Sequence, residues 1–129
     1  MAMNVELVSP ERILYSGDAE MVTCRTVGGG DIAFLAEHAP FLGALEIGKV
    51  KVKTSEGEDV QAAVHGGFVH VRDNQVIILS DVAELADDID ADRARKAKEA
   101  AERRDADIDD AAAEAAIARA NIRLEVAGK

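Results

Sequence analysis

The sequence predicts an α+β protein: an N-terminal antiparallel β-sandwich over residues 1–86, followed by a C-terminal antiparallel α-helical hairpin over residues 87–129. Two observations support this division. Both prolines and nine of the ten glycines lie before position 87, whereas alanine dominates after it. Apolar residues also alternate with polar ones in the first part and recur at helical spacing in the second. The sequence therefore predicts two domains of different architecture.

Short strands separated by turns account for the first part. The segments expected to form strands are NVELV, RILY, AEMVTCRTV, DIAFL, GKVKVKT, VQAAVH, FVHVR and QVIILS. Gly28–Gly30 and Asp73–Asn74 are expected to form turns, the second of them a two-residue hairpin turn. The pair Gly66–Gly67 indicates a bulge or a close approach of two backbone segments. Because no helical segment intervenes, these strands predict a β-sandwich or flattened barrel.

Two amphipathic helices account for the second part. Asp90 is a suitable N-cap for a helix that begins at Ala91. The acidic segment Asp105–Asp109 predicts a turn, and a second helix should run to about Val126. The residues that face the partner helix are expected to be Ala91, Ala94, Ala97 and Ala101 on the first helix and Ile117, Ala120 and Leu124 on the second. Alanine favours helix but buries little apolar area, so the hairpin is predicted to detach or rearrange easily.

Composition excludes several classes of protein. The formal net charge is −10, which argues against a general binder of nucleic acid or anionic lipid. No apolar run approaches the ~20 residues of a membrane-spanning helix, and we expect no secretory signal. The single cysteine, Cys24, cannot form an internal disulfide, which suits a reducing compartment. The 129 residues are enough for one domain, or for a small domain with an appendage.

The sequence predicts no catalytic centre and no metal site. His38, His65 and His70 match no zinc-site spacing. Gly28–Gly30 lacks the Lys-Ser/Thr that follows in a P-loop, and no serine lies in a nucleophile elbow. Cys24 is expected to be a small core residue without an activated thiolate. An enzyme that uses one of the histidines is the least favoured alternative.

The segment DDIDADRARK, residues 87–96, is compatible with two interpretations, of which the first is an anion site. Arg119 and Arg123 lie four residues apart and share a face of the second helix. An antiparallel hairpin would bring them toward Arg93, and three guanidiniums together would favour phosphate groups. The alternative is a solvated helix face on which these arginines pair with nearby carboxylates, namely Asp87, Asp88, Asp90, Asp92 and Glu114. Spacing alone leaves both interpretations open.

Three segments carry a resemblance to a known family. VELVSPERILYSGDAEMV resembles the opening strands of the epsilon subunit of bacterial F-type ATP synthase. GDIAFLAEHAPFLGAL is similar to that family's G-E-x-G-I-L-P-G-H-x-P, with Ala33 and Ala36 in place of the usual Gly and Pro before His38. AVHGGFVHVRDNQVIILSD resembles its S-G-G-F-x-E-V stretch and final strand. The resemblance extends over essentially the whole chain.

The resemblance implies a non-catalytic subunit of the proton-translocating rotary enzyme, with no catalytic cofactor. Its sandwich would bind the gamma subunit and the c-ring in the central stalk. Its hairpin would lie compact on the sandwich, or extend toward the alpha and beta subunits and inhibit ATP hydrolysis. The protein would be peripheral, at the cytoplasmic face of the bacterial plasma membrane, without membrane insertion and without nucleic acid as a partner.

Some family members bind ATP in the compact hairpin through a motif written [IL]-D-x-x-R-A, which IDADRA matches. By this resemblance Arg119 and Arg123 would meet the phosphates with help from Arg93, and Asp90 would meet the adenine–ribose end. Ala100 and Ala112 replace cations of the tight binders, which predicts weaker binding. The expected ATP-binding residues are Glu84, Ile89, Asp90, Arg93, Ala94, Arg119 and Arg123. The rival interpretation is a stand-alone nucleotide-binding sensor without a rotary partner.

Overall fold

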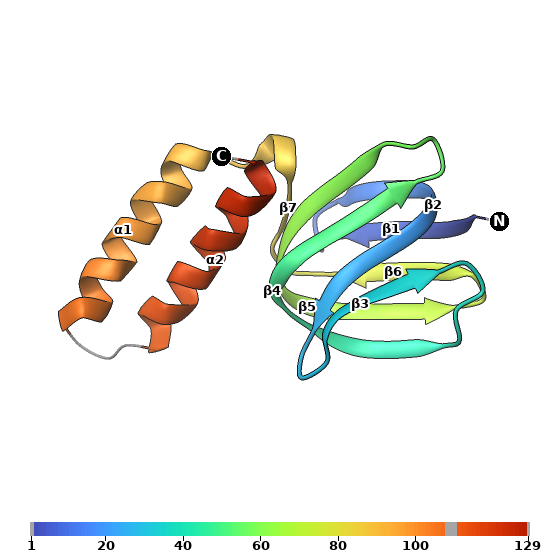
Figure 1. The fold of residues 1–129 in the computed structure, drawn as a ribbon, viewed down its shortest axis with the longest axis horizontal. Coiled ribbons are helices and arrows are strands. Elements are labelled where there is room, and N and C mark those ends of the chain that lie inside the picture. Colours follow the sequence, from blue (N-terminus) through green and yellow to red (C-terminus); the bar gives the residue numbers. More distant parts are fainter. Residues whose placement is uncertain (1, 108–110, 129) are drawn as a thin grey trace.

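The computed structural model describes residues 2–107 and 111–128, and it shows a seven-stranded β domain with a two-helix hairpin beside it (Figure 1). This is the predicted fold class. The elements are β1 (Met3–Val8), β2 (Ile13–Thr26), β3 (Gly30–Leu35), β4 (Phe41–Thr54), β5 (Asp59–Arg72), β6 (Gln75–Leu79), β7 (Ala83–Leu85), a 3-10 turn η1 (Ala86–Asp88), α1 (Ala91–Asp107) and α2 (Ala111–Ala127).

The strands close on themselves around one apolar core. Their order is β1-β6-β5-β4-β2-β3, β1 also pairs with β2, and β7 is added to β5. All of these pairs are antiparallel except β1–β6, which is parallel. The parallel pair was not predicted, because no turn motif connects strands so far apart in sequence. Alternating apolar side chains, among them Val5, Val22, Phe34, Val52 and Ile78, fill the interior.

Three strands, β2, β4 and β5, are longer than predicted, and β4 begins at Phe41 rather than at the predicted segment GKVKVKT. RILY and AEMVTCRTV belong to the single strand β2, and VQAAVH and FVHVR both belong to β5, so the prediction of separate strands was wrong. In β5 the change of direction occurs within the strand, where Gly66 and Gly67 adopt φ values of 88° and 117°. A Cβ on Gly67 would overlap the carbonyl oxygen of Leu79. The predicted close backbone approach is therefore confirmed at this glycine.

The turn between β5 and β6 is the predicted two-residue hairpin. Asp73 and Asn74 have φ values of 50° and 61°, the positive values that a type I′ turn requires. The Asn74 amide also ties this turn to its surroundings, because its Nδ2 donates to the carbonyl oxygen of Ala2 at 2.9 Å and its Oδ1 accepts from the Glu37 N–H at 2.8 Å. One side chain thus anchors both the N-terminal strand and the β3–β4 connection.

Helix α1 begins where the sequence predicted. The Oδ1 of Asp90 accepts a hydrogen bond from the backbone N–H of Arg93 at 3.0 Å, which is an N-cap bond. The predicted turn over 105–109 is wrong for residues 105–107, which continue the helix, and its last two residues lie outside the described part of the chain. The high helix propensity of the alanine-rich segment outweighs the weak preference of aspartate against helix.

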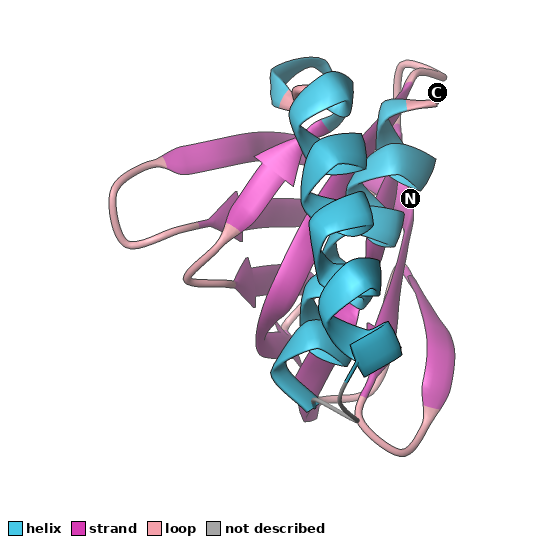
Figure 2. Ribbon diagram, turned by 90° about the vertical axis from the view of Figure 1, so that its left-hand side faces the viewer, coloured by secondary structure: helices cyan, strands magenta, loops and turns pink. Residues whose placement is uncertain are grey.

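The hairpin lies on one side of the β domain, with α2 between α1 and the sheet (Figures 1 and 2). Helix α2 contacts β4 and β5 as well as η1. Small side chains form most of the contact between the helices, since the buried residues there include Ala94, Ala101, Ala113 and Ala120. The predicted alanine seam is confirmed at Ala94, Ala101 and Ala120. Ala113 was not predicted, and Ala97, which was predicted, is exposed. No helix in residues 2–107 or 111–128 is long and apolar enough to cross a membrane.

Candidate functional site

A pocket of about 280 Å³ lies where the start of α1 and the end of α2 meet β7 and η1. In Figure 1 these segments lie side by side at one end of the hairpin. The pocket carries three carboxylates, two guanidiniums and two alanine methyl groups. Its lining residues are Glu84, Asp88, Asp90, Arg93, Ala94, Ala97 and Arg123.

An ion pair forms the wall of the pocket that faces the sheet. Nε of Arg123 on α2 lies 2.5 Å from Oε1 of Glu84 on β7, and both side chains are less than one-third exposed. Partial burial strengthens such a charge-assisted hydrogen bond relative to one in water. Only Nε is used for Glu84, so the terminal nitrogens of Arg123 carry four further donors.

The opposite wall is the first turn of α1. Asp90 occupies the N-cap, and the backbone N–H groups of the first turn give this end of the helix a partial positive charge. Arg93 follows on the exposed side, and no carboxylate in residues 2–104 or 111–128 lies within 4 Å of its guanidinium nitrogens. Ala94 is buried and Ala97 lies one turn further along, so the floor is small and apolar.

His65 lies beside Glu84 and the arginines of α2, a position that the sequence did not predict for it. Its side chain is 4% exposed, and its Nε2 lies 3.4 Å from Oε1 of Glu84. Neither ring nitrogen has a hydrogen-bond partner among residues 2–107 and 111–128. Burial, followed by the charge of Arg123 and then that of Arg119, lowers the pKa of His65, although Glu84 acts in the opposite direction. No local signal in the sequence marks this position, because the β5–β7 pairing brings His65 and Glu84 together.

Five of the seven predicted ATP-binding residues line the pocket: Glu84, Asp90, Arg93, Ala94 and Arg123. Ile89 and Arg119 do not line it. Arg119 lies one turn earlier on α2, where its charge acts on His65, so the three guanidiniums do not all reach one pocket. Asp88 and Ala97 line the pocket without having been predicted.

The alternative interpretation, a solvated helix face, predicted that Arg93, Arg119 and Arg123 pair with nearby carboxylates of the hairpin segment. Asp92 pairs with Arg95, and Asp88 pairs with Arg12 at 3.3 Å. Neither pair uses Arg93, Arg119 or Arg123. Arg123 does form an ion pair, and its partner is Glu84 on β7 rather than one of the carboxylates named in that alternative. The observed pairs therefore leave Arg93 available at the pocket.

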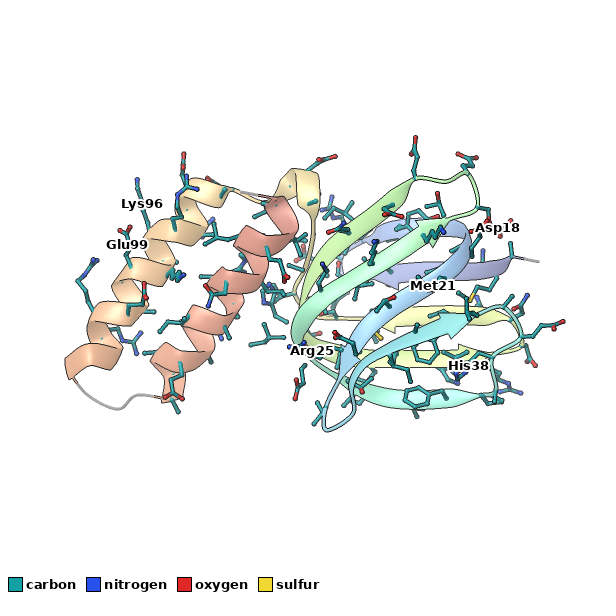
Figure 3. The ribbon with its side chains drawn as sticks, viewed as in Figure 1. Asp18, Met21, Arg25, His38, Lys96 and Glu99 are labelled. Atoms are coloured by element: carbon teal, nitrogen blue, oxygen red, sulfur yellow. The ribbon has the colours of Figure 1, made fainter. Side chains whose placement is uncertain are left out.

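The remaining candidates lie elsewhere. His38 lies at the end of the β domain away from the hairpin (Figure 3), with its ring edge against Phe34. Cys24 is fully buried, and burial raises its thiol pKa to about 12, as befits a core residue. Lys96 and Glu99 extend from α1 on the side away from α2 (Figure 3). Among the described residues no group of three or more His, Cys, Asp or Glu side chains could hold a metal ion.

Comparison with known proteins agrees with this architecture. Residues 2–86 match the family described as ATP synthase, Delta/Epsilon chain, beta-sandwich domain. An ATP synthase epsilon chain of Streptomyces griseus is 47% identical over 122 residues, which cover 95% of this chain and 92% of that protein. An ATP synthase epsilon chain of Halalkalibacterium halodurans is 43% identical over 132 residues, with 98% of each covered.

The solved structures extend the comparison to the whole fold. A chain in the structure of Euglena gracilis mitochondrial ATP synthase, OSCP/F1/c-ring, superimposes with a TM-score of 0.83 at 27% identity, covering 99% of this chain and 82% of that one. A chain in the Tetrahymena thermophila mitochondrial ATP synthase central stalk shares the fold, with a TM-score of 0.56 at 22% identity over 71% of this chain and 72% of that one. The chain therefore belongs to the family of ATP synthase epsilon chains, which are non-catalytic subunits of that enzyme.

Proposed function

We propose that this chain is a central-stalk subunit that binds the gamma subunit and the c-ring of a proton-translocating ATP synthase, at the cytoplasmic face of the bacterial plasma membrane. The Euglena relative belongs to an assembly that contains F1 and a c-ring. An apolar surface on this chain supports a protein partner: Leu42, Phe68 and Leu79 are 71%, 57% and 46% exposed on the adjacent strands β4, β5 and β6. Exposed apolar patches of this kind mark interaction sites.

The hairpin pocket is proposed to bind ATP as a regulatory ligand. The observation that carries this proposal is the meeting of Arg93 from α1 and Arg123 from α2 in one pocket. Two guanidiniums from different helices suit a polyphosphate, because they bind its oxygens with paired hydrogen bonds. The volume of about 280 Å³ lies near the lower limit for small-molecule sites, roughly 300–1,000 Å³. The nucleotide would therefore remain partly in solvent.

The orientation of the nucleotide follows from the charges. The phosphates are placed at Arg93 and Arg123, with Arg119 one turn before Arg123 on α2. The adenine and ribose are placed at the Asp90 side, where the methyl groups of Ala94 and Ala97 leave room for a flat ring. Asp90 can accept from a ribose hydroxyl with the oxygen that does not cap the helix.

Regulation follows from the position of the pocket. A ligand that contacts α1, α2 and β7 binds only the compact hairpin, so it stabilises that state by mass action. The extended hairpin would lose the ligand, reach the alpha and beta subunits and inhibit ATP hydrolysis. ATP would thus keep the subunit in its permissive form.

Calorimetric titration of the full chain with ATP tests the ligand. Arg93→Ala should weaken binding about tenfold or more, because a charged hydrogen bond contributes roughly 1.5–3 kcal/mol. Arg95→Ala is the matched control: Arg95 lies on the same helix, pairs with Asp92 and does not line the pocket. Equal loss in both variants, or no binding at millimolar ATP, would refute the site.

Co-purification with the gamma subunit tests the stalk role separately. A stable complex that survives Arg93→Ala would support the stalk role, whatever the result with ATP. Failure to bind gamma, combined with tight ATP binding, would instead support a stand-alone nucleotide sensor.

A further inference from the structure

We propose that His65 makes the docking of the hairpin sensitive to acid, because a proton on its buried ring places a third cation at Glu84, the carboxylate that pairs with Arg123 of α2. This inference concerns the contact between α2 and the β domain. It does not depend on nucleotide binding in the adjacent pocket.

The surroundings of His65 are set by four elements. On β5 its backbone N–H donates to the carbonyl oxygen of Val82 at 3.1 Å, and its register partner on β4 is the apolar Ile47. The charged groups that face the ring are Glu84 from β7 and Arg119 and Arg123 from α2. With a neutral ring, one carboxylate faces two guanidiniums. With a protonated ring, it faces three cations.

Glu84 cannot readily balance the extra charge. Its Oε1 already accepts from Nε of Arg123 at 2.5 Å, whereas Nε2 of His65 lies 3.4 Å from the same oxygen and is not hydrogen-bonded to it. A protonated ring would compete with Arg123 for that oxygen. Since the ring is only 4% exposed, water does not reach it to disperse the charge. Release of α2 removes both arginines and exposes the ring.

The direction of the pH effect follows from linkage. Docking lowers the pKa of His65 below its ordinary value of 6.5, first by burial and then through Arg123 and Arg119. In the detached hairpin neither arginine faces the ring, so its pKa returns toward the ordinary value. Docking is therefore fully stable above about pH 6.5 and weakens as the pH falls toward the lowered pKa. Each unit of pKa difference corresponds to about a tenfold change in the docking constant.

Energy transfer between two labels on the full chain measures docking directly. Lys96→Cys on α1 and Glu56→Cys in the β4–β5 turn give exposed sites outside the His65 cluster. The native Cys24 is fully buried, so it is protected from labelling. We expect transfer to change between pH 7.5 and pH 5.5 in the otherwise wild-type chain. His65→Gln should abolish the change, and His70→Gln, an exposed histidine on the same strand, should retain it.

Two outcomes overturn the proposal. One is a wild-type signal that does not change with pH, and the other is the same change in His65→Gln, which would assign it to other groups. Should His65→Gln be detached at every pH, an NMR titration of the His65 ring in the unsubstituted chain decides. A ring pKa below about 6.5 supports the proposal, and one at or above that value refutes it.

Discussion

Nε of Arg123 lies 2.5 Å from Oε1 of Glu84, and this contact joins the last helix to the last strand of the sheet. Arg123→Ala should weaken the docking of the hairpin by roughly 1.5–3 kcal/mol, because the partly buried carboxylate loses its charged partner. The measurement is denaturant unfolding, followed by helical circular dichroism. A double-mutant cycle with Glu84→Gln isolates the pair from other effects of each change.

The exposed pair Arg12–Asp88 provides the control for that measurement. It also connects the β domain to the segment before α1, but its side chains are 61% and 51% exposed. Exposed pairs contribute less than about 1 kcal/mol. Equal losses in Arg12→Ala and Arg123→Ala would contradict the special role assigned to the Glu84 contact.

Asp90 caps α1 and is also proposed to contact ATP, and two substitutions can separate these roles. Asp90→Ala should lower the stability of α1 by about 1 kcal/mol, because the N-cap bond to Arg93 is lost. Asp90→Ser should keep the cap, since serine is a comparable N-cap residue. Circular dichroism measures the helix and calorimetry measures ATP binding. Full ATP affinity in Asp90→Ser would show that the carboxylate itself does not contact the ligand.

Gly67 is expected to be among the least replaceable residues of the β domain. Gly67→Ala places a methyl group against Leu79 and within 2.9 Å of the Ser80 Cα, at a φ of 117°. The cost should exceed about 3 kcal/mol, because backbone on both sides must move. Gly57→Ala shares the positive φ, at 92°, but meets nothing within 4 Å. It should cost only about 1–2 kcal/mol, so equal unfolding midpoints for the two variants would exclude the steric explanation.

The thiol of Cys24 should resist alkylation in the native protein. Burial, and secondarily the Asp31 carboxylate, raise its pKa from 9.0 to about 12. A raised pKa stabilises the fold below the ordinary pKa, and that contribution is lost as the pH rises from 9 toward 12. Mass spectrometry after iodoacetamide treatment at pH 8 should find no modification until denaturant is added. Rapid native labelling would show that the strand opens locally.

The sequence contains clear local signals for much of this fold. The Asp73–Asn74 turn and the cap at Asp90 are each specified by neighbouring residues, and both are found where predicted. The alanine seam is found at Ala94, Ala101 and Ala120 but not at Ala97. Whether two predicted strand segments join into one continuous strand has no comparable local signal. A glycine pair such as Gly66–Gly67 ends a strand in one context and bends it in another, and the neighbouring backbone decides which. Partners distant in the chain, such as β1 and β6, lack a local signal altogether.

The pocket shows the same limit at the level of side chains. Helical spacing and the motif together indicated Arg93, Arg123 and Asp90, because all three depend on the geometry of one hairpin. The position of Arg119 depends on how α2 turns toward the sheet, which its own sequence does not specify. His65 does not line the pocket, and it comes close to Glu84 through the pairing of β5 with β7. The division into domains at residues 86 and 87 stays a prediction.

Five strands, β1, β6, β5, β4 and β2, form a closed ring of hydrogen-bonded neighbours. A ring has no outer strand from which the ladder can be peeled bond by bond. A pull between opposite sides must instead shear several ladders at once, so the rupture force should be high and the domain stiff. A stiff domain transmits an applied torque with little deformation of its own.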